Sequence, residues 1–307
     1  MYTLNRLEQA FEALAYQAFT FPRFRPLLQA LKPQSSIVAI AASDANQPIG
    51  LALAQIQPDR QSCKVLSIFV KPNYRQQGIG TALLQRLEAE LHQCQCDRAE
   101  LTYTTGNPTT SSLERLLQKR DWSDPKPRML VGKTTTDTIS DAPWMKRISL
   151  PVAYSLFPWQ EITPTDRIAL QQQKSPWIPP MLLPFLHEEN IEPLNSLGLR
   201  YQGEVVGWLI THRLDPATVR YTCGFIRPDL KLRYISLLAN AIQIQIDAKI
   251  PFGIWTIPLE FSSMAHFVKA RMAPYLISLE ESKVAYKSLK PYKTTTERLN
   301  AREYSLN

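Results

Sequence analysis

Two glycines, Gly78 and Gly80, stand where a helix is about to begin, directly after the polar residues Arg75, Gln76 and Gln77. The first N–H groups of a helix have no intrahelical acceptor, and together with the helix dipole they form a binding site for phosphate. Glycine removes Cβ atoms from this backbone and allows positive φ, so an anion can approach closely. The stretch therefore predicts an anion-binding loop, to which Arg75 adds a positive charge.

Two other phosphate-binding loops fit this stretch less well. A Walker loop needs G-x-x-x-x-G-K-[ST], and the sequence contains no such run. The dinucleotide fingerprint needs a third small residue three places after the second glycine, and that place is Leu83. A plain tight turn would give the same two glycines, so the pair alone does not identify a ligand.

The elements on both sides must position the loop. Ahead of it, Val65–Val70 (VLSIFV) is an apolar, partly β-branched run that is typical of a buried strand. Behind it, leucines recur at helical spacing as far as Leu91. The predicted unit is strand, tight loop and helix.

A longer pattern is much more specific. From Val70 to Gly80 the sequence reads V-x-P-x-Y-R-x-x-G-x-G, which resembles the acetyl-CoA signature of the GNAT superfamily of N-acyltransferases. The resemblance covers about residues 1–135. It implies a strand that splays from its neighbour, acetyl-CoA or another acyl-CoA as co-substrate, and a primary amine of a small molecule or a protein as acceptor.

By position, the resemblance also implies which residues bind the coenzyme. The residues that would line the pantetheine arm are Ile68, Phe69 and Val70. The residues that would hold the pyrophosphate are Arg75, Gln76, Gln77, Gly78, Ile79, Gly80 and Thr81.

The resemblance is weaker in the catalytic machinery. The family's proton-donating tyrosine lies five residues before an aromatic that closes its helix, and counting back from Trp122 gives Leu117. Ser67 stands where many relatives carry Glu. The nearest substitutes are Glu100 as base and Tyr103 as acid. The same two residues are also compatible with a glutamate exposed to solvent at a strand edge and a tyrosine packed in the core, neither of them catalytic. Holding amine and thioester together already removes much of the barrier.

The second half of the chain repeats the first. Phe225–Lys231 (FIRPDLK) echoes Phe69–Arg75 (FVKPNYR) 156 positions later, and in that alignment Tyr234 stands where Gly78 does. A tyrosine side chain would occupy the volume that a pyrophosphate needs. We therefore expect a degenerate GNAT-like domain without the coenzyme, although Lys231 and neighbouring basic residues could still bind an anion.

Composition sets broad limits. The chain has 307 residues, of which 44% are hydrophobic, and a net charge of +8, as expected for a globular protein of two domains with an anionic ligand. No nucleic-acid-binding motif accompanies the charge. The sequence offers no membrane span and no signal peptide, which predicts a cytoplasmic protein.

Four scattered cysteines do not form a disulfide framework. His92–Cys96 (HQCQC) lacks a second ligand pair at zinc-like spacing, so we expect a helix end and no metal.

The expected fold class is α/β with a mixed sheet, in two GNAT-like domains in tandem. We predict an acetyl-CoA-binding domain over residues 1–135, a polar linker over 136–147 and the degenerate domain over 148–307. The expected helices cover 4–19, 24–31 and 110–119, and the expected strands cover 37–42, 49–56, 99–103, 129–132 and 252–257. In the second domain, 175–181 and 187–189 could border a substrate cleft.

Three functions are compatible with these patterns. The first is an N-acetyltransferase that moves an acyl group from acetyl-CoA to an amine. The second is a non-catalytic acyl-CoA sensor or assembly module, which the missing tyrosine and carboxylate favour. The third is a phosphate-loop protein that binds another nucleotide.

Overall fold

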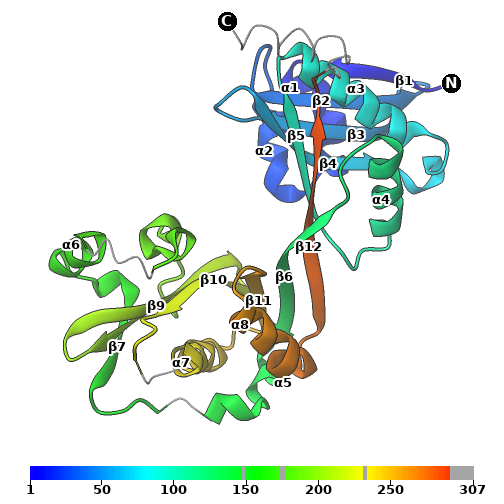
Figure 1. The fold of residues 1–307 in the computed structure, drawn as a ribbon. Helices are drawn as coiled ribbons and strands as arrows, with labels where there is room; N and C mark the ends of the chain where they lie inside the picture. Colours follow the sequence, from blue (N-terminus) through cyan, green and yellow to red (C-terminus); the bar gives the residue numbers. More distant parts are fainter. Residues whose placement is uncertain (147–148, 173–177, 231–233, 291–307) are drawn as a thin grey trace, which may run out of the picture. The chain divides into compact units, whose positions relative to one another are not determined.

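The computed structural model describes residues 1–146, 149–172, 178–230 and 234–290 (Figure 1). The chain divides into two compact units. The first comprises Met1–Pro127 together with the C-terminal segment from Lys283, and the second comprises Arg128–Ser282.

The sheet of the first unit contains strands from both ends of the sequence. Its order is β1-β2-β3-β4-β5-β12. The strands are β1 Thr3–Leu7, β2 Ile37–Asp44, β3 Gln47–Ile56, β4 Ser62–Val70, β5 Arg98–Thr104 and β12 Ser278–Ser288. The β4–β5 pair is parallel, whereas β1–β2, β2–β3 and β3–β4 are antiparallel. The predicted mixed sheet is therefore confirmed.

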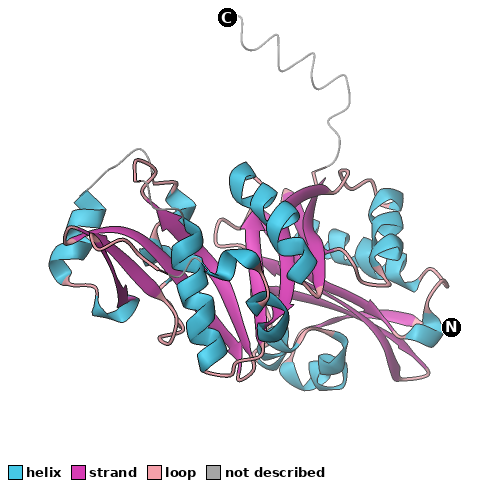
Figure 2. Ribbon diagram, turned by 90° about the horizontal axis from the view of Figure 1, so that it is seen from below, coloured by secondary structure: helices cyan, strands magenta, loops and turns pink. Residues whose placement is uncertain are grey.

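Helices cover both faces of this sheet (Figure 2). They are α1 Ala10–Ala13, α2 Arg25–Gln29, α3 Ile79–Gln93 and α4 Thr110–Lys119. The leucines of α3 that follow the helical repeat are buried against β2, β3 and β4, which makes the main core of the unit. The α1–α2 layer closes a second core on the opposite face.

The N-terminal residues differ from the prediction. A single helix over 4–19 was expected, but Thr3–Leu7 forms β1, which pairs with β2 and alternates in burial along its length. Leu4 and Leu7 suit a helix by their spacing alone. The edge of β2 supplies backbone hydrogen bonds that a short isolated helix cannot match.

The second unit repeats this plan. Its strand order is β6-β11-β10-β9-β8-β7. The strands are β6 Lys126–Thr135, β7 Tyr154–Pro158, β8 Leu197–Tyr201, β9 Glu204–Asp215, β10 Thr218–Ile226 and β11 Phe252–Pro258. The helices are α5 Thr136–Ser140, α6 Pro164–Gln172, α7 Tyr234–Asp247 and α8 Ser262–Phe267.

Matching backbone details confirm the predicted repeat. Gly50 pairs with Val70, and 156 to 157 positions later Gly207 pairs with Ile226. A Cβ atom on either glycine would lie 2.9 Å from a carbonyl oxygen of the next strand, Phe69 O or Phe225 O. Both positions therefore require glycine for the same close approach of backbone.

The chain crosses between the units earlier than the sequence suggests. Residues 136–146, expected to form a linker, contain α5 and a short 3-10 helix, Pro143–Lys146. Ile139 and Trp144 are buried in the core of the second unit. Thr135 and Thr138 form a capping box that explains why so polar a stretch is helical.

Candidate functional site

The predicted anion-binding loop lies at the start of α3. Gly78 precedes the helix with φ of +81°, and a Cβ atom there would meet nothing within 4 Å. The Ala82 N–H donates to Gly78 O at 3.0 Å, so the N–H groups of residues 79–81 precede the first intrahelical bond. This backbone is bare and open, which fits a bound phosphate.

The two glycines of the loop differ in backbone conformation. Gly78 uses the positive φ that glycine allows, whereas Gly80 is helical, and the other loop residue with positive φ is Gln76, at +61°. A Cβ atom on Gly80 would lie 3.8 Å from Val70 Cγ2 and 3.9 Å from Leu116 Cδ2. A methyl group at Gly80 would therefore make van der Waals contact with both β4 and α4.

Arg75 holds the loop against the strand. Its Nε donates to Val70 O at 3.0 Å, and within the described residues its Nη atoms have no protein partner. Ile79 has a buried side chain in the main core, so only its backbone can contact a ligand.

Strands β4 and β5 separate beside this loop. Their parallel pairing ends at Val65 and Leu101, although β4 continues to Val70 and β5 to Thr104. β4 stays paired with β3 to its end, and a bulge at Leu66 marks the place where it leaves β5. The edge of β4 from Leu66 onward thus offers backbone groups to a ligand that lies between the strands.

The walls of this opening are apolar. Several side chains that pack against the main core are only partly buried, and five of them lie on α4 or on the parts of β4 and β5 beyond their last pair: Ile68, Val70, Tyr103, Leu113 and Leu116. Phe69 lies on the other face, where its ring stacks on Phe19 at 4.9 Å between centroids. Of the predicted arm-lining residues, two line the opening with side chains and Phe69 can do so only through its backbone.

The two predicted acid–base residues lie on opposite faces of β5. Ala99 and Leu101 face the main core, and so does Tyr103, whereas Glu100 points the other way. Glu100 is half-buried, pairs in register with Lys64 and lies one residue before the strands separate. Its carboxylate accepts a long hydrogen bond from Thr102 Oγ1 at 3.4 Å.

The hydroxyl of Tyr103 is already engaged. It donates to Glu114 Oε1 of α4 at 2.6 Å, and the same oxygen accepts from Lys283 Nζ of β12 at 3.0 Å. Burial raises the pKa of Tyr103, and the bond to Glu114 raises it further. The pKa of Glu114 is lowered, first by the Tyr103 hydroxyl and then by the Lys283 ammonium.

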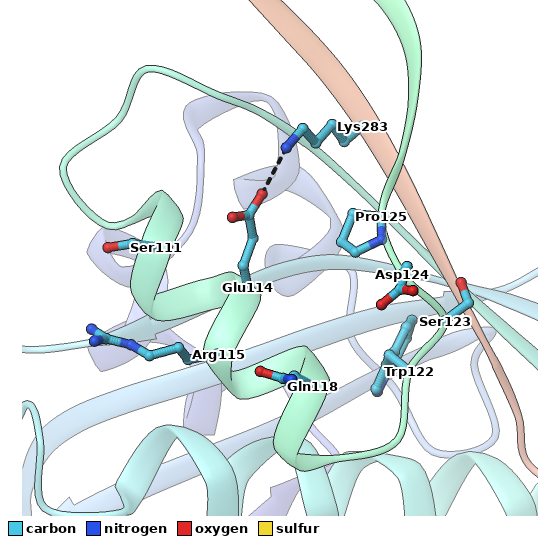
Figure 3. A pocket seen from close by; sticks show the side chains of 9 residues that line it. All are labelled: Ser111, Glu114, Arg115, Gln118, Trp122, Ser123, Asp124, Pro125 and Lys283. Atoms are coloured by element: carbon cyan, nitrogen blue, oxygen red, sulfur yellow. Dashed lines mark hydrogen bonds and ion pairs between the residues drawn. The ribbon is translucent and has the colours of Figure 1, made fainter.

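Glu114 also borders a pocket of about 470 Å³ (Figure 3). The polar outer face of α4, the segment Trp122–Pro125 and Lys283 form its walls. Sequence reasoning missed both Glu114 and Lys283, since they lie 169 positions apart and no local pattern links them.

Two positions at which the family carries its acid and its carboxylate contain other side chains here. Leu117 is buried in the main core, and a leucine cannot donate a proton. Ser67 bonds to Thr20, with 2.7 Å between the two hydroxyl oxygens, on the face of β4 opposite α3.

The equivalent opening in the second unit is filled. Strands β10 and β11 also separate, after Tyr221 and Trp255. The side chain of Tyr234 crosses this space, and its hydroxyl occupies the place where a Cβ on Gly224 would stand. Gly224 corresponds to Ile68 and Tyr234 to Gly78, so the second unit has a glycine on the strand, where the first has isoleucine, and a tyrosine at the start of the helix, where the first has glycine. Residues 231–233 lie outside the described residues.

The other segments proposed for a cleft in the second unit hold its own fold. Residues 175–177 lie outside the described residues. His187 Nε2 bonds to Met181 O at 2.8 Å, and Glu188 accepts from Trp159 Nε1 and from Arg167. These contacts connect the layer that covers β8 to β10.

Comparisons with known proteins agree with this geometry. Residues 3–117 match the model of the acetyltransferase (GNAT) family. A search of curated proteins gives no match. A tandem GNAT protein from the clavulanic acid biosynthesis pathway has a similar structure, with a TM-score of 0.64 and 14% identity, covering 95% of this chain and 100% of that one.

Two further structures are similar along nearly the whole chain. A GCN5-related N-acetyltransferase from Sphaerobacter thermophilus gives a TM-score of 0.64 at 14% identity, over 94% of this chain and 96% of that one. A glucosamine N-acetyltransferase region of a fungal β-N-acetylglucosaminidase gives a TM-score of 0.61 at 14% identity, over 94% of this chain and 38% of that one.

The first unit therefore contains a GNAT domain, and the whole chain has the fold of tandem GNAT proteins. At family level this supports an acyl-CoA N-acetyltransferase, with acetyl-CoA and an amine as its general partners. Among the described residues, no helix has the length and apolar character needed to span a membrane.

Proposed function

We propose that the first unit transfers an acyl group from acetyl-CoA, or another acyl-CoA, to a primary amine. The observation that carries the proposal is the opening between β4 and β5, which meets the bare start of α3. The N–H groups of Ile79, Gly80 and Thr81, with the Nη atoms of Arg75, would hold the pyrophosphate. The free edge of β4 would bind the amides of the pantetheine arm.

The two faces of β5 fit a division of roles. The coenzyme would occupy the side of α3 and α4, so the amine must approach from the other side, where Glu100 lies. Glu100 would take the proton that the attacking nitrogen loses. Tyr103 lies on the coenzyme side and would have to leave Glu114 to protonate the thiolate, which costs about 1.5–3 kcal/mol for a hydrogen bond to a charged group.

Little acid help is needed for the departing thiol. A thiol has an ordinary pKa of about 8.5, so its thiolate is a tolerable leaving group near neutral pH. The main contribution of the chain would be to hold thioester and amine together.

The engaged Tyr103 and the unreactive Leu117 and Ser67 also support the alternative, a non-catalytic acyl-CoA-binding module. Isothermal titration with acetyl-CoA, followed by mass spectrometry of a panel of primary amines incubated with protein and acetyl-CoA, tests both. Acetylated amine supports the enzyme, whereas binding without product across the panel supports the module. No binding of any acyl-CoA would refute both.

A further inference from the structure

We propose that Lys283 is a positioning residue for the coenzyme: through Glu114 it fixes the Tyr103 ring as one wall of the acyl-CoA cleft. The proposal rests on the proposed function, because it assumes that the opening between β4 and β5 receives the coenzyme. It assigns a role in the first unit to a residue near the far end of the sequence.

Tyr103 lies where a wall is needed. It is two residues beyond the last pair between β5 and β4, on the face that bears Ile68 and Val70. Leu113 and Leu116 of α4 contact the same cluster. A ring that can swing at this point would either block the opening or leave it poorly shaped for a ligand.

A single carboxylate oxygen restrains the ring. Glu114 Oε1 accepts both the Tyr103 hydroxyl at 2.6 Å and the Lys283 ammonium at 3.0 Å (Figure 3). The Glu114 side chain is 35% exposed and Lys283 is 24% exposed. Without the ammonium, Glu114 is free to turn toward solvent, and Tyr103 then loses its acceptor.

The arrangement is particular to the unit that has an open cleft. In the second unit, Ile257 occupies the position of Tyr103, because Trp255 and Leu101 occupy equivalent places in the two parallel pairs. Ile257 is buried and has no hydroxyl to bond. A contact needed only to complete the fold would be expected in both copies, whereas this one accompanies the cleft.

The experiment is a double-mutant cycle on the intact chain, measured by acetyl-CoA titration and by thermal unfolding. The variants are Lys283→Met, Tyr103→Phe and both together, with Lys283→Arg as the conservative variant. Lys290→Met is the matched control. Lys290 follows the same strand, and its ammonium pairs at 2.7 Å with Asp97, which directly precedes β5, at the end of that strand farther from the opening.

We expect Lys283→Met to weaken acetyl-CoA binding three- to tenfold and to raise the KM for acetyl-CoA more than it lowers kcat. Lys283→Arg should restore most of the affinity, and Lys290→Met should bind like the wild type. In the Tyr103→Phe background, Lys283→Met should have no further effect on affinity, because the hydroxyl through which Lys283 and Glu114 restrain the ring has already been removed.

Two results would overturn the proposal while leaving the proposed function intact. One is wild-type affinity in Lys283→Met. The other is an equal loss from Lys283→Met whether or not the Tyr103 hydroxyl is present, which would mean that the lysine acts by another route. A wild-type chain that binds no acyl-CoA would instead refute the proposed function, and this proposal with it.

Discussion

Replacing Gly80 by alanine should make the free protein more stable and the complex weaker. Gly80 lies in the first turn of α3 with helical φ, so alanine gains up to about 1 kcal/mol in helix propensity. Its methyl group would meet Val70 and Leu116 at 3.8 and 3.9 Å, which is ordinary contact and adds about 0.8 kcal/mol of burial. The same methyl group would occupy the space beside the loop in which we propose that the coenzyme lies.

The loss of affinity should be at least tenfold, or about 1.4 kcal/mol. At a ligand concentration of 100 times the wild-type Kd, acetyl-CoA stabilises the wild type by about 2.7 kcal/mol, and a tenfold weaker variant by only about 1.4 kcal/mol. Thermal unfolding with and without acetyl-CoA measures both effects on the same sample. A variant with higher stability and unchanged affinity would refute the placement of the coenzyme against Gly80.

Gly78→Ala provides the contrasting case at the same loop. Gly78 has φ of +81° and open space around its Cβ position, so the cost is conformational and should lower the stability of the free protein by about 1–2 kcal/mol. Alanine should therefore raise the stability of the free protein at Gly80 and lower it at Gly78. Thermal unfolding of the two free variants measures this difference, which separates a glycine needed for ligand access from one needed for its backbone conformation.

Three further predictions concern catalysis, pH and the second unit. If Glu100 is the base, Glu100→Gln should lower kcat about 10²-fold or more with nearly unchanged acetyl-CoA affinity, and full activity would exclude that role. Arg200 bonds both oxygens of Asp166, at 3.0 and 2.6 Å, and holds the pKa of that carboxyl below its usual range. Because the folded pKa is lowered, this stabilisation is complete above the unfolded pKa of about 3.9 and fades as the pH falls below it. Asp166→Asn should therefore lower the free energy of unfolding by about 1.5 kcal/mol at neutral pH, as measured by urea titration. The difference between variant and wild type should shrink below about pH 4 and stay constant above it. Tyr234→Ala should destabilise the second unit by about 3–5 kcal/mol through the cavity it leaves, while calorimetry still gives one acetyl-CoA per chain; two per chain in the wild type would contradict the filled opening.

Local sequence patterns were sufficient to predict the strand and the helix on either side of the proposed coenzyme-binding loop. The glycine spacing, the apolar strand before it and the leucine repeat after it each indicate their structure without help from distant residues. Helix 110–119 and the strand at 252–257 were also predicted to within a residue or two, because their patterns are long and regular. The repeat was visible in the similar runs Phe69–Arg75 and Phe225–Lys231, and the structure adds that both copies preserve the glycine that backbone contact requires.

What the sequence left out depends on partners far along the chain. Residues 3–7 form a strand because the edge of β2 is available, and nothing within those residues states this. Glu114 looks like an ordinary surface glutamate of an amphipathic helix until Tyr103 and Lys283 are placed beside it. The boundaries between the two units could likewise not be predicted from the sequence, because they fall within strands: β6 and β12 each begin in one unit and end in the other.

The returning strand gives the second half of the chain a role that does not require a ligand of its own. Beside β5, Lys287 of β12 pairs at 3.2 Å with Glu88, a side chain only 7% exposed that also accepts from Trp122 Nε1 and Arg120. A buried carboxylate that loses one of its partners is strongly destabilising. A chain cut at residue 135 would lose this lysine, Lys283 and the strand beside β5 together. The second half of the chain thus completes the sheet of the first unit, a structural contribution that does not depend on whether the second unit binds a ligand.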